Sequence, residues 1–294
     1  MKDGFIRVAA ATPDIHVADP QYNSEQIIEL MEQGSTRGVK VMAFPELCLT
    51  AYTCSDLFLQ ESLLREAKKE LKRILQASKS KDMILFVGMP WMHKGKLYNV
   101  AAVLNRGRIL GIVPKKHLPN YSEFYELRHF NPGMEKVEMT DWEGVQVPMG
   151  MNLLFACRTM PELVLAAELC EDVWVPCPPS ISHALAGATV IANCSASDET
   201  TGKDQYRYNL ICGQSARLVC GYIYANAGEG ESTTDLVFGG HNIIAENGTT
   251  LASSNRFSNE VIYTEIDVKR LLSERRKNTT FQTEKERTLI RIPF

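Results

Sequence analysis

The alternation of apolar and polar residues predicts strands and helices in turn along most of the chain. Phe5–Ala11 is an apolar run typical of a buried strand, and Ser24–Arg37 repeats apolar residues at helical spacing. Two more apolar runs, Lys40–Phe44 and Met83–Gly88, predict strands before and after a helix with a basic face over Ser62–Ser78. This order of elements is typical of an α/β protein.

Two dipeptides predict the turns of β-hairpins. Arg106-Gly107 lies between apolar segments within residues 97–113, and Asn247-Gly248 lies between apolar segments within residues 238–253. Asn-Gly in particular favours the left-handed backbone that a two-residue hairpin turn requires. Because hairpins interrupt the alternation of strands and helices, we expect more than one sheet.

The second half of the chain continues the alternation. The expected strands are Leu153–Cys157, Leu163–Cys170, Thr189–Asn193, Tyr222–Ala227 and Val261–Asp267, and the expected helices are Ser180–Ala186, Gln205–Val219 and Val268–Lys277. Ser180 follows two prolines and is expected to cap the first of these helices. No Gly- or Ser-rich linker is found, so we expect one domain over residues 1–294, ending in a polar tail (278–294) available to pack on a partner.

Composition and charge exclude several classes of function. A net charge of −3 gives no reason to expect nucleic acid or an anionic membrane as a partner. No apolar stretch approaches the roughly 20 residues of a membrane span, and Arg7 interrupts any signal-peptide core. We therefore expect a cytoplasmic protein whose 8 cysteines are reduced thiols. Because no Cys-x-x-Cys pair occurs and the 6 histidines do not cluster near cysteines, we expect no metal site.

Three polar residues follow apolar strands and could carry chemistry together. Glu46 follows Val41–Pro45, Lys115 follows Ile109–Pro114, and Cys170 ends the run that begins at Leu163. Strand ends at one edge of an α/β sheet gather functional groups. A carboxylate could take the thiol proton, an ammonium could stabilise an oxyanion, and the thiolate could attack a carbonyl carbon.

Each of these residues also has an ordinary structural explanation. A free cysteine in a strand is usually part of the core. A glutamate after a strand is usually solvated, and Lys115-Lys116 has the form of an exposed basic pair. Position alone therefore favours the structural explanation for each.

The sequences around the three residues change that balance. Phe44-Pro45-Glu46-Leu47, the segment Lys115–Pro119 and Leu169-Cys170-Glu171-Asp172 resemble the three signatures of the nitrilase, or carbon–nitrogen hydrolase, superfamily. The resemblance implies a four-layer α-β-β-α sandwich. It also implies Glu46 as general base, Lys115 as electrophile and Cys170 as nucleophile, with Glu123 as a second glutamate that positions the triad.

Longer segments resemble one branch of the superfamily, the glutaminase domains of glutamine-dependent NAD synthetases. The segments that carry this resemblance are 118–126, 170–176, 184–188, 195–199, 202–207 and 227–236. The branch implies glutamine as the substrate and the following residues as its contacts: Tyr121, Ser197, Lys203, Glu171, Phe124 and Tyr52. Some relatives carry Arg where this chain has Lys203. Lysine keeps the positive charge for a substrate carboxylate but cannot make the two parallel hydrogen bonds of a guanidinium.

The resemblance also implies which cofactors and partners to expect. The glutaminase reaction needs none, whereas ATP and Mg belong to a synthetase domain whose Ser-Gly-Gly-x-Asp-Ser loop is absent from this sequence. We expect a synthetase domain, on the same or another chain, and further copies of this chain as partners. Two alternatives stay open: a freestanding ω-amidase, nitrilase or carbamoylase, and a domain retained for assembly rather than catalysis.

Overall fold

A computed structural model describes residues 3–282 and 289–294 of the chain. The helices are α1 (Pro20–Thr36), α2 (Glu61–Ser78), α3 (Pro179–Leu185), α4 (Lys203–Leu218) and α5 (Val268–Lys277), with short 3₁₀ helices η1 (Ser55–Leu59), η2 (Glu126–Arg128) and η3 (Cys170–Val173). The strands are β1 (Phe5–Ala11), β2 (Val41–Ala43), β3 (Ile84–His93), β4 (Lys96–Asn105), β5 (Arg108–Pro114), β6 (Glu138–Trp142), β7 (Val145–Met149), β8 (Leu153–Ala156), β9 (Val164–Leu169), β10 (Val190–Ser195), β11 (Gly221–Asn226), β12 (Ile243–Glu246), β13 (Thr249–Ser253), β14 (Val261–Asp267) and β15 (Ile290–Pro293).

The strands form two sheets in the described part of the chain. One has eight strands in the order β14-β1-β2-β3-β4-β5-β7-β6, and the other has seven in the order β13-β12-β11-β10-β9-β8-β15. Parallel pairing joins β1 to β2 and β2 to β3 in the first sheet, and β9 to β10 and β10 to β11 in the second. Hairpins extend both sheets, as the Arg106-Gly107 and Asn247-Gly248 turns predicted.

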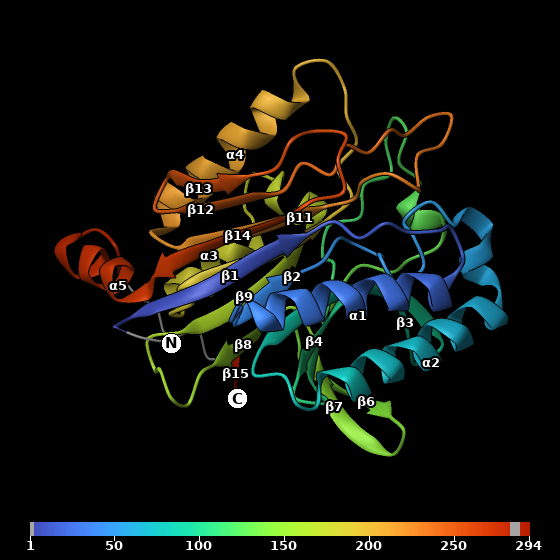
Figure 1. Ribbon diagram of the computed structural model, residues 1–294, viewed down its shortest axis with the longest axis horizontal. Helices are drawn as coiled ribbons and strands as arrows, with labels where there is room; N and C mark the ends of the chain where they lie inside the picture. The colour runs from blue at the N-terminus through green and yellow to red at the C-terminus, as the bar shows by residue number, and fades with distance from the viewer. Residues whose placement is uncertain (1–2, 283–288) are drawn as a thin grey trace.

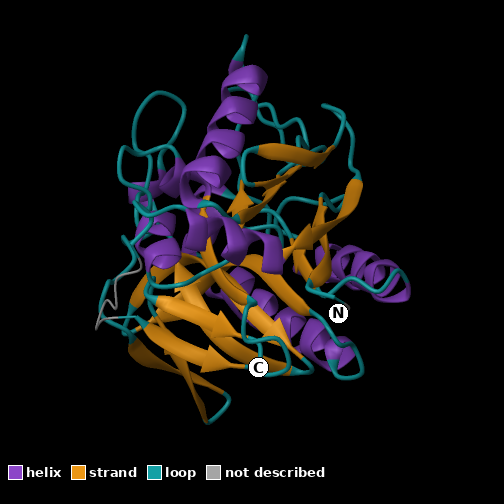
Figure 2. Ribbon diagram, turned by 90° about the vertical axis from the view of Figure 1, so that its left-hand side faces the viewer, coloured by secondary structure: helices purple, strands orange, loops and turns teal. Residues whose placement is uncertain are grey.

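The two sheets pack face to face, with helices on the outside. Along β1, Val8 and Ala10 face the second sheet, whereas Ala9 and Ala11 face α1 and α2. Helices α3 and α4 cover the outer face of the second sheet. Figure 1 shows α1 and α2 on one flank of the strands and α4 on the opposite flank, and Figure 2 gives the side view. The predicted four-layer α-β-β-α sandwich is confirmed.

Three expectations differ from the structure. The first is the cap of α3: Pro178 precedes the helix and no side chain caps it, because Ser180 lies inside the first turn. The second is the hairpin of β6 and β7, which the pattern did not predict. The third is the tail, where Ile290–Pro293 pairs in parallel with β8 of its own sheet and Ile292 packs against the core between the sheets. Residues 283–288 of that predicted tail lie outside the described residues.

One close approach in the first sheet sets the path of the chain after β2. A Cβ on Gly88 of β3 would lie 2.2 Å from the Pro45 carbonyl oxygen and 2.4 Å from the Leu47 nitrogen. The Gly88 carbonyl also accepts a hydrogen bond from the Leu49 backbone N–H at 3.2 Å. The segment that carries Glu46 therefore lies directly against β3 at a position where only glycine fits.

Replacing Gly88 by alanine tests this approach. We expect Gly88→Ala to lower the free energy of unfolding by about 3 kcal/mol, because backbone atoms cannot move aside as a flexible side chain would. Gly213→Ala is the matched control: Gly213 lies in α4, and outside its own stretch of helix no atom lies within 4 Å of the added Cβ. That change should raise stability by about 0.5 kcal/mol, since alanine favours helix. Urea unfolding of both variants measures the difference, and equal effects would contradict the account.

Candidate active site

The three predicted catalytic residues lie where strand ends of the two sheets meet. Glu46 follows β2 and Lys115 follows β5 of the first sheet, whereas Cys170 follows β9 of the second. Two hydrogen bonds join the Glu46 segment to the second sheet: the Glu46 backbone N–H donates to the Ser195 carbonyl at 3.3 Å, and the Ala196 N–H donates to Glu46 Oε2 at 3.1 Å. The charges of Glu46 and Lys115 both act on the Cys170 thiol.

Lys115 is a fully buried ammonium held by two carboxylates. Its Nζ lies 2.6 Å from Glu46 Oε1 and 2.5 Å from Glu126 Oε1. Asn99 Nδ2 donates to Glu46 Oε1 at 2.6 Å, and the Tyr52 hydroxyl donates to Glu126 Oε1 at 2.7 Å. Both carboxylates are buried as well, so the ammonium exchanges water for charged partners.

The second glutamate at Lys115 is Glu126, and the prediction of Glu123 for that contact is wrong. The chain turns sharply after Lys115: Ser122 has a φ of +51°, and the Glu126 backbone N–H donates to the Pro119 carbonyl at 3.2 Å. This turn points Glu126 toward Lys115 and leaves Glu123 on the wall of the cavity beside Cys170. Counting eight residues from Lys115 could not reveal which glutamate the turn directs inward.

Burial and the pair of carboxylates set the protonation of the site. Burial raises the pKa of Glu46 to about 7, with Lys115 opposing the rise and Glu126 adding to it. Burial works against the Lys115 ammonium, but the charges of Glu126 and Glu46 outweigh it and raise its pKa well above the usual value. The pKa of the Cys170 thiol is raised by burial and by the Glu46 charge. Lys115 is therefore a permanent cation, and Cys170 is a neutral thiol that needs a base.

Cys170 sits in a strained backbone at the junction of β9 and η3. Its φ is +37°, which is rare for a residue with a side chain and costs about 1 to 2 kcal/mol. The regular strand conformation ends before Cys170. The residue lines a cavity although it is buried as a whole. Such outliers occur where surrounding contacts hold the chain for function.

Asp172 connects the Cys170 loop to the Lys115 loop, a role that nothing in the sequence predicts beyond the motif that contains it. The buried carboxylate accepts hydrogen bonds from the backbone N–H groups of Leu169, Lys116 and His117 at 3.1, 3.3 and 2.9 Å. It also lies 3.0 Å from His117 Nδ1. His117 thus contacts Asp172 rather than the thiol, which agrees with a structural role for this histidine.

The cavity beside Cys170 gathers most of the predicted substrate contacts. It has a volume of about 360 Å³, and its walls include Tyr121, Phe124, Glu171, Ser197 and Lys203. The Tyr121 hydroxyl donates to Glu171 Oε1 at 2.9 Å. Tyr52, the remaining predicted contact, lines an adjoining cavity of about 220 Å³ and reaches Glu126 instead. The cavity therefore presents groups of both charges next to the thiol.

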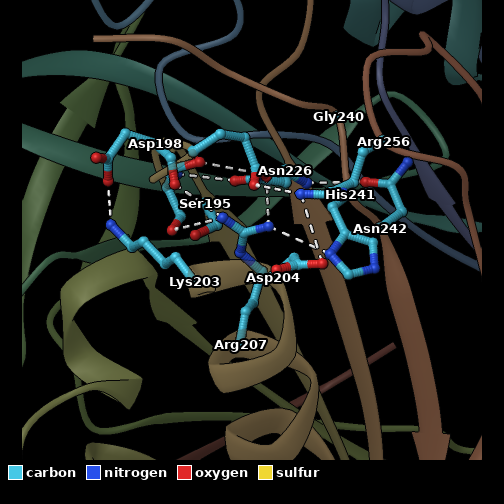
Figure 3. Close-up of polar contacts among 12 residues, drawn as sticks. Ser195, Asp198, Lys203, Asp204, Arg207, Asn226, Gly240, His241, Asn242 and Arg256 are labelled. Carbon is cyan, nitrogen blue, oxygen red and sulfur yellow. Dashed lines mark hydrogen bonds and ion pairs between the residues drawn. The ribbon is translucent and has the colours of Figure 1, made fainter. Parts of the chain in front are cut away.

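A buried polar network supports the Lys203 side of the cavity. Lys203 at the start of α4 forms an ion pair with Asp198, and its Nζ lies 5.7 Å from the centre of the Phe124 ring. Arg207, one turn further along α4, is fully buried, and it donates to the Asp198 carbonyl at 2.9 Å and the Ser197 hydroxyl at 3.3 Å. Figure 3 shows Arg207 pointing from α4 toward Asn226 and His241, with Lys203 reaching Asp198. The contacts of Arg207 and Lys203 thus hold Ser197 and Asp198 in place at the cavity.

Metal ligation and membrane insertion have no support in the described ranges. Between residues 3 and 282 and from 289 to 294, no group of three or more His, Cys, Asp or Glu side chains could hold a metal ion. Within the same ranges no helix combines the length and apolar character needed to span a bilayer. All eight cysteines are free thiols, and Cys48 is packed beside the Glu46 segment, where its Sγ lies 3.6 Å from the Gly88 carbonyl oxygen.

Known proteins resemble this chain in both sequence and fold. The glutamine-dependent NAD(+) synthetase of Mycobacterium bovis is 42% identical over 280 residues, which cover 95% of this chain and 41% of that protein. The structure of a glutamine-dependent NAD(+) synthetase from Cytophaga hutchinsonii superposes with a TM-score of 0.80 at 28% identity, covering 89% of this chain and 43% of that one. An amidase from Nesterenkonia sp. shares the fold with a TM-score of 0.70 at 18% identity, covering 95% and 97%. The chain thus spans less than half the length of the two synthetases.

The family itself follows from a match over most of the chain. Residues 7–276 match the sequence model of the carbon-nitrogen hydrolase family. The matched region contains the strand ends that carry Glu46, Lys115 and Cys170, and it ends within α5. The chain belongs to the carbon–nitrogen hydrolase family.

Proposed function

We propose that this chain hydrolyses the side-chain amide of glutamine to glutamate and ammonia through a thioester on Cys170. The observation that carries the proposal is the buried arrangement of Glu46, Lys115 and Glu126 beside Cys170, at a cavity lined by Lys203 and Glu171. An amino acid carries one ammonium and one carboxylate, and the cavity walls carry a group of opposite charge for each: Glu171, and Lys203, which also pairs with Asp198. The volume of about 360 Å³ suits a ligand of that size.

The first half of the reaction forms the thioester. Glu46 takes the proton of the Cys170 thiol, and the thiolate attacks the amide carbon of glutamine. Because the thiol pKa lies above that of Glu46, this transfer is uphill and needs charge stabilisation as the bond forms. The Lys115 ammonium and the backbone N–H of Glu171 supply it to the developing oxyanion. Glu46 then gives its proton to the nitrogen as the C–N bond breaks and ammonia leaves.

The second half of the reaction releases glutamate. Glu46, now ionised again, takes a proton from a water molecule, and the hydroxide attacks the thioester carbonyl. Lys115 again faces the oxyanion, and collapse of the tetrahedral intermediate breaks the C–S bond. The proton held by Glu46 returns to the sulfur, which restores the thiol. No metal or organic cofactor enters either half.

In the whole protein we propose that this ammonia serves NAD synthesis. The support is the 42% identity to a glutamine-dependent NAD(+) synthetase of which the chain spans 41%. A synthetase domain would then be the partner that receives ammonia, and ATP and Mg would act there. We also propose a cytoplasmic location, and the superfamily resemblance supports a homo-oligomer.

Removal of the nucleophile tests the proposed reaction. We expect Cys170→Ala to abolish glutamate formation from glutamine, because no thioester can form, while urea unfolding stays close to that of the parent chain. Ammonia release measures turnover, and Cys177→Ala, which removes an exposed cysteine, is the control. A panel of simple amides, nitriles and N-carbamoyl compounds decides the substrate class. Normal turnover by Cys170→Ala would contradict the role of the thiol. Faster hydrolysis of a panel compound than of glutamine would contradict the choice of substrate.

The raised pKa of Glu46 predicts the pH dependence of the reaction. Only the ionised carboxylate can take the thiol proton, and burial holds the pKa of Glu46 at about 7. We therefore expect kcat/KM for glutamine to rise with pH through about 7 and to level off above it. Initial rates across that interval give the profile. A profile that falls with rising pH would show that a protonated group, not an ionised Glu46, drives the first step.

The contacts of Lys115 predict different effects for the two nearby glutamates. We expect Glu126→Gln to lower kcat about 100-fold, because the variant removes one of the two ionic contacts that hold the buried ammonium in position. Glu123→Gln removes a charge from the cavity wall only, so its loss in kcat should be at least about tenfold smaller. Steady-state kinetics of both variants at saturating glutamine give the comparison. The reverse order would restore Glu123 as the positioning glutamate.

A further inference from the structure

The backbone of Cys170 is held by a side chain rather than by the sheet. The last paired residues of β9 and β10 are Leu169 and Cys194, so the ladder ends one residue before the nucleophile. The Cys170 backbone N–H then donates to Asn193 Oδ1 at 3.1 Å. With a φ of +37°, Cys170 is in a conformation that its own backbone does not favour. A contact at this N–H therefore controls where the Cα–Cβ bond of the nucleophile points.

A chain of hydrogen bonds continues from Asn193 into the layer between the second sheet and its helices. Asn193 Nδ2 donates to the Tyr222 hydroxyl oxygen at 3.1 Å, and that hydroxyl donates to Glu168 Oε1. The other oxygen of Glu168 accepts from the Ser180 backbone N–H at 2.8 Å. Glu168, Asn193 and Tyr222 come from the adjacent strands β9, β10 and β11, so the chain crosses three strands.

The hydrogen bonds of this chain orient the Asn193 amide. Rotating the Asn193 amide would place its NH₂ group against the Cys170 N–H, donor against donor. Tyr222 prevents that rotation because it accepts from Nδ2 while its own proton is committed to Glu168. Each of Glu168, Asn193 and Tyr222 is at most 1% exposed, so water cannot replace a lost partner without opening the core. In such surroundings an unpaired polar group is destabilising.

We propose that Asn193, Tyr222 and Glu168 form a relay that positions the Cys170 nucleophile for catalysis. None of the three residues lines the substrate cavity, and Asn193 meets Cys170 at its backbone N–H, so they act through the Cys170 backbone. They are positioning residues, and the inference rests on the proposed role of Cys170. Without the relay the backbone at Cys170 relaxes toward an ordinary conformation, and the thiol turns away from Glu46 and Lys115.

The first experiment replaces the amide by an apolar group of similar shape. We expect Asn193→Leu to lower kcat for glutamine by about 30-fold while KM changes less than about threefold, because a small displacement of the nucleophile affects the chemical step most. Alkylation of Cys170 by iodoacetamide, followed by mass spectrometry of its peptide, should slow by a similar factor of about 10 to 30. The alkylation assay needs no glutamine, so it tests the relay even if glutamine proves not to be the substrate.

A milder variant and a double variant separate positioning from general stability. Tyr222→Phe keeps the ring and removes the hydroxyl, and we expect a loss of about tenfold in kcat. It also decides the question if Asn193→Leu does not fold. Because both residues act through one chain of bonds, Asn193→Leu with Tyr222→Phe should lose little more than Asn193→Leu alone. Independent residues would instead give multiplied losses.

Thr189→Val is the matched control for stability. The Thr189 hydroxyl is buried at the opposite end of the same strands, where it donates to the Glu162 carbonyl at 2.8 Å and accepts from the Val164 N–H at 3.1 Å. Its loss should lower stability to urea as much as Tyr222→Phe does, yet leave kcat and Cys170 alkylation within about twofold. The relay is overturned if Thr189→Val slows alkylation as much as Tyr222→Phe, or if neither relay variant slows it.

Discussion

The fold of this chain around its active site depends on one buried charge, the ammonium of Lys115. A lone ammonium without water would be very costly, and the 2.6 and 2.5 Å contacts with Glu46 and Glu126 offset that cost. Removing either carboxylate would leave the ammonium with a single charged partner in a buried site, and removing both would leave it uncompensated, a situation that typically costs about 3 to 5 kcal/mol. Burial, to which the negative charge of Glu126 adds, explains why the pKa of Glu46 is raised to about 7 although it touches a lysine.

The two sheets supply this arrangement because their strands end at a common place. The chain after β2 passes against Gly88, and the chain after β5 is met by Gly133, whose backbone N–H donates to the Lys115 carbonyl at 2.7 Å. Asp172 then joins the loop of the second sheet to the segment after Lys115. The carboxylate, the ammonium and the thiol thus follow three separate strands. Hydrogen bonds made by the backbone of these segments fix the distances between the three groups.

The periodic elements could be predicted from the sequence because burial imposes their spacing. β1, β14 and α5 begin and end at the predicted residues, and both predicted hairpins form. The hairpin of β6 and β7 escaped prediction because it lies at the edge of the sheet, where Met139 and Val145 are exposed and the apolar alternation is weak.

The site was predictable only where strands lead directly into it. Glu46, Lys115 and Cys170 each follow an apolar run, and the motifs around them made a catalytic role predictable. Glu126 was not, because the positive φ at Ser122 and the turn back to Pro119 reverse which glutamate faces inward. Asn193 also escaped notice, since an asparagine within a strand looks like any other buried polar residue until its partners are known.

Direct observation of the covalent intermediate tests the central claim that this buried site makes Cys170 an acylating nucleophile for glutamine. The chain would be mixed with glutamine, quenched with acid at early times and digested, and the Cys170 peptide would be weighed by mass spectrometry. The account predicts that the mass of this peptide rises transiently by the mass of glutamine minus the mass of ammonia. Steady glutamate release without an adduct on Cys170, or with the adduct on another cysteine, would contradict it.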